Sequence, residues 1–89
     1  MLDIKIIHKE LKRLGYKKSG TGLASRWYEN SKGELVLEYS RWGWDEHYSF
    51  YGLKTVYPFY ENYRLDLVEV SKDRIVIRTH VEDIVIGRA

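Results

Sequence analysis

Nine of the thirteen aromatic residues in this chain fall between positions 42 and 63, within 22 residues. These nine are Trp42, Trp44, Tyr48, Phe50, Tyr51, Tyr57, Phe59, Tyr60 and Tyr63. Each ring has a large area to bury, and Tyr and Trp also carry a polar group. A chain this short buries only about 60–65% of the surface that its unfolded form exposes, so its core is thin. We therefore expect Trp27, Phe50 and one of the two tryptophans of the stretch in the core, and several tyrosines outside.

The first 14 residues predict an amphipathic helix over residues 3–14. Four apolar residues recur at the spacing that places them on one stripe: Ile4, Ile7, Leu11 and Leu14. Asp3 suits the N-cap position, and Gly15 suits the left-handed conformation that ends a helix. Four basic residues fall on a neighbouring face: Lys5, Lys9, Lys12 and Arg13. Residues 16–25 are rich in glycine and hydroxyl groups, which indicates a loop.

Residues 26–29 and 34–39 alternate in polarity and predict a β-hairpin. Gly33 suits the left-handed position of a short turn with a bulge between them. The register that follows pairs Trp27 with Leu37 on the face that we expect to be buried.

A third strand is expected over residues 45–53, followed by a loop over 54–62 that holds the only proline. A second hairpin is predicted for residues 63–70 and 74–81, and a last strand for 84–86. The register of this second hairpin pairs Leu67 with Ile77 and Asp66 with Arg78. We expect an α+β fold of one domain over residues 1–89, with the N-terminal helix packed on a four- to five-stranded, mainly antiparallel sheet in two layers.

The net charge of +2 is unevenly distributed. Residues 1–26 hold seven basic and two acidic residues, a net charge of +5, so the remainder carries −3. The chain has no cysteine, no glutamine and one methionine beside 31% charged residues, a usage typical of thermophile proteins. No apolar run approaches the roughly 18 residues of a membrane span, so we expect a soluble, cytoplasmic protein.

These patterns favour a small non-enzymatic binding module that contacts nucleic acid or a nucleoprotein partner. The residues that we expect to contact phosphates or acidic side chains are Lys9, Lys12, Arg13, Lys17 and Lys18. The residues that we expect to supply stacking or anchoring rings are Trp42, Trp44, Tyr48 and Tyr60.

Two alternatives stay open. The aromatic residues of 42–63 would equally serve a protein–protein adaptor or inhibitor, including a homodimer, because Tyr and Trp dominate protein interfaces. A small ribonuclease would use His80 or His47 as a general base, with Arg74 or Arg78 beside a phosphate. The three histidines lack the spacing of zinc ligands, so we expect no metal site. We also expect no small-molecule cofactor and no membrane partner.

Overall fold

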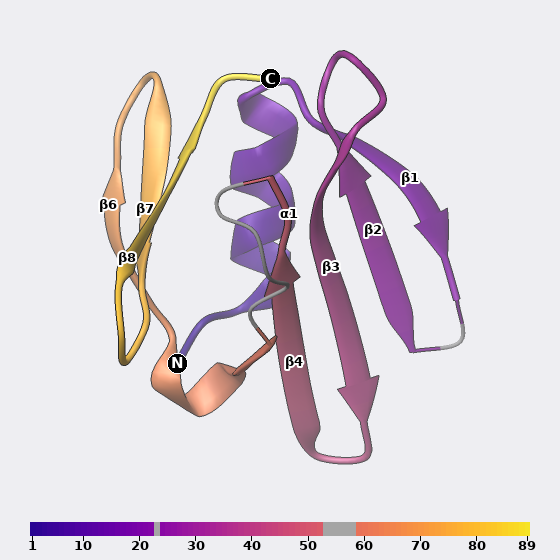
Figure 1. Ribbon diagram of the computed structural model, residues 1–89, viewed down its shortest axis with the longest axis vertical. Helices are drawn as coiled ribbons and strands as arrows, with labels where there is room; N and C mark the ends of the chain where they lie inside the picture. Colours follow the sequence, from indigo (N-terminus) through magenta and orange to yellow (C-terminus); the bar gives the residue numbers. More distant parts are fainter. Residues whose placement is uncertain (23, 53–58) are drawn as a thin grey trace.

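The computed structural model describes residues 1–22, 24–52 and 59–89. Within these residues the chain forms one α-helix, one short 3-10 helix and eight β-strands (Figure 1). In chain order the elements are α1 (Ile4–Arg13), β1 (Lys17–Thr21), β2 (Ser25–Glu29), β3 (Leu35–Trp42), β4 (Asp45–Phe50), β5 (Phe59–Glu61), η1 (Asn62–Arg64), β6 (Asp66–Val70), β7 (Arg74–Arg78) and β8 (Asp83–Gly87). All strand pairs are antiparallel, and they form a five-stranded sheet of β1–β5 and a three-stranded sheet of β6–β8.

Helix α1 begins and ends where the sequence predicts. The Asp3 carboxylate accepts a hydrogen bond from the Lys5 backbone N–H at 2.8 Å, which satisfies a donor of the first turn. Gly15 follows the helix with a φ of +97°, a conformation that glycine adopts without strain. The four apolar residues of the predicted stripe are all buried: Ile4, Ile7, Leu11 and Leu14.

Strand β1 replaces the loop that the sequence predicts over residues 16–25. It pairs with β2, with Lys17 opposite Glu29 and Thr21 opposite Arg26. The glycine, serine and lysine residues of β1 have little intrinsic preference for a strand, so the exposed edge of β2 supplies the reason for the pairing. A Cβ atom on Gly20 would lie 3.0 Å from the Trp27 ring, so glycine lets this ring lie against β1.

The β2–β3 hairpin forms as predicted, but its register differs by one residue. Tyr28 lies opposite Leu37, and Trp27 lies opposite Glu38, because a bulge follows Tyr28. The shift places Tyr28 in the core and leaves Trp27 half-buried, which corrects the expectation that Trp27 fills the core. Gly33 has the left-handed conformation that we expected, with a φ of +78°.

The segment after β4 differs in part from the prediction. Strand β4 occupies the first part of the expected strand, whose last residue, Leu53, lies outside the described residues. The predicted loop of 54–62 was wrong from residue 59 onward, because Phe59–Glu61 pair with β4 as strand β5. Residues 54–58 of that loop also lie outside the described residues.

The second hairpin has the two predicted pairs, but near its turn Val70 lies opposite Ile75, and a bulge between Leu67 and Glu69 restores the expected register. Leu67 lies opposite Ile77, and Asp66 lies opposite Arg78. The first residues of the expected strand form η1 instead, so β6 begins at Asp66. The expected last strand is β8, which pairs with β7 and completes the smaller sheet.

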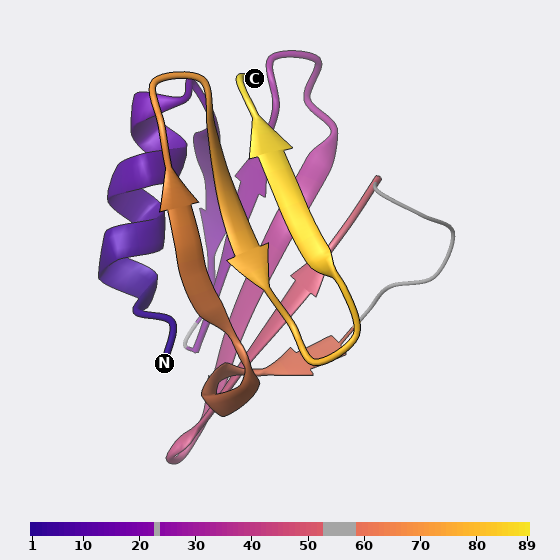
Figure 2. The ribbon, with the colours of Figure 1, turned by 90° about the vertical axis from the view of Figure 1, so that its left-hand side faces the viewer.

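The two sheets face each other, and α1 lies along one side between them (Figures 1 and 2). The core fills the space that these three parts enclose. The core consists of the apolar stripe of α1, the side chains on the inner face of the larger sheet and the alternating isoleucines of β7 and β8. This arrangement confirms the predicted α+β class, with one helix on a mainly antiparallel sheet.

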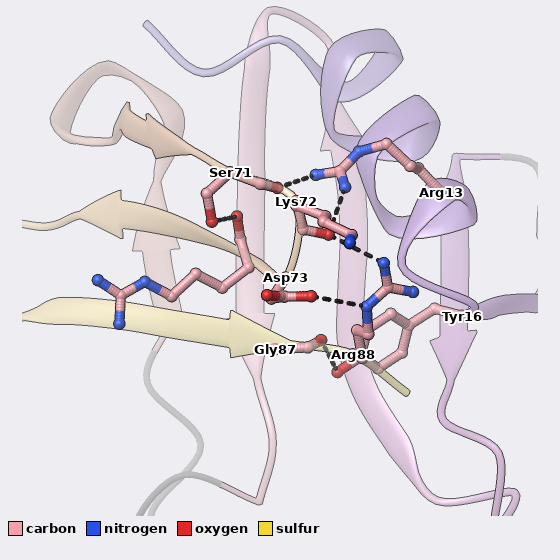
Figure 3. A network of polar contacts seen from close by, with 8 residues as sticks. Arg13, Tyr16, Ser71, Lys72, Asp73, Gly87 and Arg88 are labelled. Atoms are coloured by element: carbon pink, nitrogen blue, oxygen red, sulfur yellow. Dashed lines mark hydrogen bonds and ion pairs between the residues drawn. The ribbon is translucent and has the colours of Figure 1, made fainter.

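Polar contacts join the end of α1 to the smaller sheet (Figure 3). The Arg13 guanidinium donates to the backbone carbonyls of Ser71 and Lys72, at 2.7 and 2.9 Å. The Tyr16 hydroxyl donates to the Gly87 carbonyl at 2.7 Å. These bonds hold the helix end against the β6–β7 turn and the end of β8, and thereby position the segment that leads into β1.

Candidate functional site

The aromatic stretch divides between core and surface. Its buried members are Tyr48, Phe50 and Tyr60, and its exposed members are Trp42, Trp44, Phe59 and Tyr63. Trp44 is 96% exposed and Trp42 is 71% exposed, so neither tryptophan enters the core as we had expected. Tyr51 is half-buried, and Tyr57 lies outside the described residues.

The burial of Tyr48 and Tyr60 corrects their assignment as contact residues. Side chains alternate between the two faces of a strand, and both of these residues point to the inner face of the larger sheet. Tyr48 lies opposite Tyr60 across β4 and β5, and the two exposed fractions are 0% and 4%. Neither ring is available to stack on a base or to enter a partner's pocket.

Three of the five predicted basic residues converge on one cavity. Lys12 of α1 and Lys17 and Lys18 of β1 line a cavity of about 420 Å³ at the edge of the larger sheet, together with His8, Tyr16 and Tyr28. We call this cavity the basic pocket. Its lysines make no ion pair with any residue that the structure describes. The pocket is therefore lined by three lysines that have no ion-pair partner among the described residues.

His8 and Tyr28 form the polar wall of the basic pocket. The His8 Nδ1 atom and the Tyr28 hydroxyl lie 3.0 Å apart and share a hydrogen bond. Burial lowers the pKa of the His8 imidazole, and nearby positive charges, with Lys18 the strongest, lower it further. The imidazole is therefore neutral at pH 7, and its second nitrogen has no partner among the described residues. Sequence reasoning missed His8, although it lies four residues before Lys12 and so on the same side of the helix.

The other two predicted basic residues lie outside the pocket. Lys9 is exposed on the helix, and it lines neither the basic pocket nor the larger cavity described below. Arg13 uses its guanidinium in the contacts to the β6–β7 turn and in an ion pair with Glu10 at 2.8 Å. Arg13 therefore joins elements of the fold.

The basic pocket and the two exposed tryptophans lie at opposite ends of the larger sheet. Lys17 pairs with Glu29, which pairs with Leu35 at the start of β3. Trp42 is the last residue of β3, seven residues beyond Leu35, and a strand advances about 3.3 Å per residue, so about 20 Å separates the two positions. Figure 1 shows the start of β1 and the β3–β4 turn at opposite ends of the molecule. The predicted combination of basic residues and rings is thus split between two surfaces.

A larger cavity, of about 720 Å³, lies between the N-terminal residues, β1 and the inner face of β3. Its wall includes Tyr39, Glu46 and Asn62, and the Glu46 carboxylate accepts hydrogen bonds from the other two. The Tyr39 hydroxyl donates to the Glu46 carboxylate at 2.6 Å, and the Asn62 amide donates to the other oxygen. Burial and this hydrogen bond raise the pKa of Tyr39 to about 12. These polar groups tie η1 to the sheet.

The residues of the ribonuclease hypothesis do not share one site. His47 stacks on Phe59 with the ring centres 4.4 Å apart on the outer face, whereas His80 contacts Tyr60, an inner-face residue. Arg74 and Arg78 form ion pairs with Glu69 and Asp83, respectively.

Comparison with protein-family models, curated proteins and solved structures finds no match for this chain. Within residues 1–22, 24–52 and 59–89, no group of three or more acidic or histidine side chains has an arrangement that would hold a metal ion. The same residues include no helix long and apolar enough to cross a membrane.

Proposed function

We propose that this protein binds single-stranded nucleic acid, with a backbone phosphate seated in the basic pocket. The observation that carries the proposal is the convergence of Lys12, Lys17 and Lys18, none of them ion-paired within the described part of the chain, on one cavity. Its volume of about 420 Å³ falls within the roughly 300–1,000 Å³ of typical ligand pockets.

The chemistry of the pocket suits a phosphate. The lysines offer positive charge and hydrogen-bond donors to phosphate oxygens, and Tyr16 offers an aromatic side chain to a sugar or base. The pKa of His8 is lowered mainly by burial, and the positive charges of Lys18, Arg26 and Lys12 lower it further. A single strand can direct one phosphate into a concave site, whereas a duplex presents its phosphates on a convex surface. No catalytic step is part of the proposal.

Salt dependence tests the proposal directly. Each phosphate neutralised on a single strand contributes about 0.7 to the slope of log affinity against log salt. One seated phosphate therefore predicts about a 2.6-fold loss of affinity between 50 and 200 mM salt. We would measure fluorescence anisotropy of labelled ten-nucleotide oligouridylate and oligothymidylate at both salt concentrations.

A matched pair of variants separates the pocket from net charge. The pocket variant carries Lys12→Ala, Lys17→Ala and Lys18→Ala, and the control carries Lys5→Ala, Lys32→Ala and Lys72→Ala, which removes the same charge from exposed positions elsewhere. We expect the pocket variant to lose the salt dependence and more than tenfold in affinity at low salt. We expect the control to stay within about twofold of the parent protein. Flat titrations of the parent at 50 mM salt, or equal losses in both variants, would refute the proposal.

A further inference from the structure

The basic pocket carries more positive charge than one internal phosphate of a strand can neutralise. Three lysines line it, and among the described residues no aspartate or glutamate does. Glu29 lies opposite Lys17 across β1 and β2, but it does not line the pocket and makes no ion pair with any described residue. An internal phosphate carries one negative charge, whereas a phosphomonoester carries about −1.5 to −2 at pH 7. The charge of the lining is therefore closer to that of a terminal phosphate.

The inner wall of the pocket is part of the folded interior. Tyr28 is 1% exposed and belongs to the hydrophobic core, and Tyr16 packs against that core with its hydroxyl bonded to the Gly87 carbonyl. The three lysines, by contrast, are exposed. The pocket therefore opens on the side of the lysines and ends at the two tyrosines. A strand that seats an internal phosphate must leave by the opening through which it enters, whereas the end of a strand needs one opening only.

The volume of the pocket also favours the end of a strand. At about 420 Å³ it lies in the range of sites that enclose most of a small molecule, roughly 300–1,000 Å³, and it is large for a phosphate group alone. A terminal nucleotide can place its sugar as well as its phosphate there, beside the aromatic side chain of Tyr16. An internal phosphate stays attached to a nucleoside on each side, and both must then fit past the same lysines.

His8 responds differently to the two kinds of phosphate. It shares a hydrogen bond of 3.0 Å with the Tyr28 hydroxyl. Its pKa is lowered first by burial and then by positive charges from three elements: Lys18 of β1, Arg26 of β2 and Lys12 of α1. A negative charge that enters the pocket acts in the opposite direction and raises the pKa of His8. A terminal phosphate, with its larger charge, should raise it further than an internal one.

We propose that the basic pocket recognises the phosphorylated end of a nucleic-acid strand, with the terminal phosphomonoester beside the three lysines. This inference rests on the proposed binding of single-stranded nucleic acid and names the part of the strand that fits the pocket best. The chemistry that is recognised is a phosphomonoester on a nucleotide, which occurs at a 5′ end, at a 3′ end or on a free mononucleotide. No bond forms or breaks in this recognition.

The test compares ten-nucleotide oligothymidylates that differ only at one end. One strand has a 5′-phosphate, one a 3′-phosphate, one two hydroxyl ends, and one the methyl ester of the 5′-phosphate, which keeps the group in place but carries one charge less. Each competes with the labelled strand in fluorescence anisotropy at pH 7.5. We expect one of the two phosphorylated strands to bind at least fivefold more tightly than the hydroxyl strand, and that strand identifies the end that is recognised.

Charge, and not the added atoms, should account for the gain. If the 5′ end is the one recognised, the methyl ester should bind within about twofold of the hydroxyl strand. One further charge adds about 0.7 to the slope of log affinity against log salt. The preferred strand should therefore lose about sevenfold in affinity between 50 and 200 mM salt, against about 2.6-fold for the hydroxyl strand.

Two measurements locate the effect in the pocket. The variant with Lys12→Ala, Lys17→Ala and Lys18→Ala should lose the preference for the phosphorylated strand, whereas the control variant with three exposed lysines replaced elsewhere should keep it. The pKa of His8, followed by nuclear magnetic resonance of its imidazole, should rise more with the preferred strand than with the hydroxyl strand. An unchanged His8 pKa would place the phosphate outside the pocket and overturn the inference.

The remaining outcomes separate this inference from the proposed function. If both phosphorylated strands bind only as tightly as the hydroxyl strand, the inference fails and the proposed function stands. A preference that survives the loss of the three lysines also overturns it, because the pocket is then not its source. Thymidine 5′-monophosphate that binds as tightly as the preferred strand would overturn the assignment to a strand end in favour of a free mononucleotide. If no strand binds at 50 mM salt, the proposed function itself fails.

Discussion

Tyr48 and Tyr39 lie opposite each other across β3 and β4, and removing their hydroxyl groups should change stability in opposite directions. Both rings are buried, with centres 5.2 Å apart. The Tyr39 hydroxyl donates to the Glu46 carboxylate at 2.6 Å, whereas the Tyr48 hydroxyl has no partner among the described residues. Burial raises the pKa of Tyr48, with a further rise from the negative charge of Glu46, so its hydroxyl stays protonated.

The size of each effect follows from this difference. A buried hydroxyl without a partner costs about 1–3 kcal/mol, so Tyr48→Phe should stabilise the protein by about 1 kcal/mol after the small void is counted. A hydrogen bond to a charged group contributes about 1.5–3 kcal/mol, so Tyr39→Phe should destabilise it by about 2 kcal/mol. For a domain of this size, 1 kcal/mol moves the melting temperature by roughly 4–8 °C.

Urea unfolding followed by circular dichroism measures both variants. We expect the midpoint to rise for Tyr48→Phe and to fall for Tyr39→Phe, with the same dependence on urea concentration in both. The reasoning is wrong if Tyr48→Phe lowers the free energy of unfolding by 1 kcal/mol or more, because that loss would mean that the Tyr48 hydroxyl has a strong partner.

Two further predictions concern the helix. Arg13→Lys keeps the charge but loses the fork that reaches Ser71 and Lys72, so the free energy of unfolding should fall by about 1 kcal/mol, whereas Arg41→Lys at an exposed position should change it by less than about 0.5 kcal/mol. Equal urea midpoints for these two variants would contradict a stabilising role of the Arg13 hydrogen bonds to Ser71 and Lys72. The pKa of His8 is lower in the folded protein than in the unfolded chain, so the unfolded state binds more protons and stability should decline as pH falls from about 6.5 toward the lowered value. His8→Gln should flatten this part of the stability–pH curve, and an unchanged curve would show that His8 does not titrate there.

Helix α1 and the β6–β7 hairpin were predictable because their signals are local. Asp3 and Gly15 bound the helix within the helix's own segment, and one short turn joins the two strands that carry Leu67 and Ile77. In each case the interacting residues lie within 12 positions of each other along the chain.

The candidate sites were predictable only in part. Lys12, Lys17 and Lys18 were singled out by charge, but His8 and Tyr28, which make the polar wall, were not. Tyr28 reaches the pocket because the bulge after it moves the register of β2 by one residue and turns its ring to the inner face.

By itself, the sequence determined the helix with its caps, the β2–β3 and β6–β7 hairpins, and the uneven distribution of charge, because each depends on residues close together in the chain. Strands β1 and β5, which the sequence predicts as loops, form by pairing with β2 and β4. Only the tertiary structure decided that Tyr48 and Tyr60 are buried while Trp42 and Trp44 are exposed, and that the basic pocket and the tryptophans lie at opposite ends of the larger sheet. The physical reason is that alternation along a strand leaves two faces equivalent until a second layer covers one of them. In this protein, α1 and the β6–β8 sheet cover the face of the larger sheet that carries Tyr48 and Tyr60.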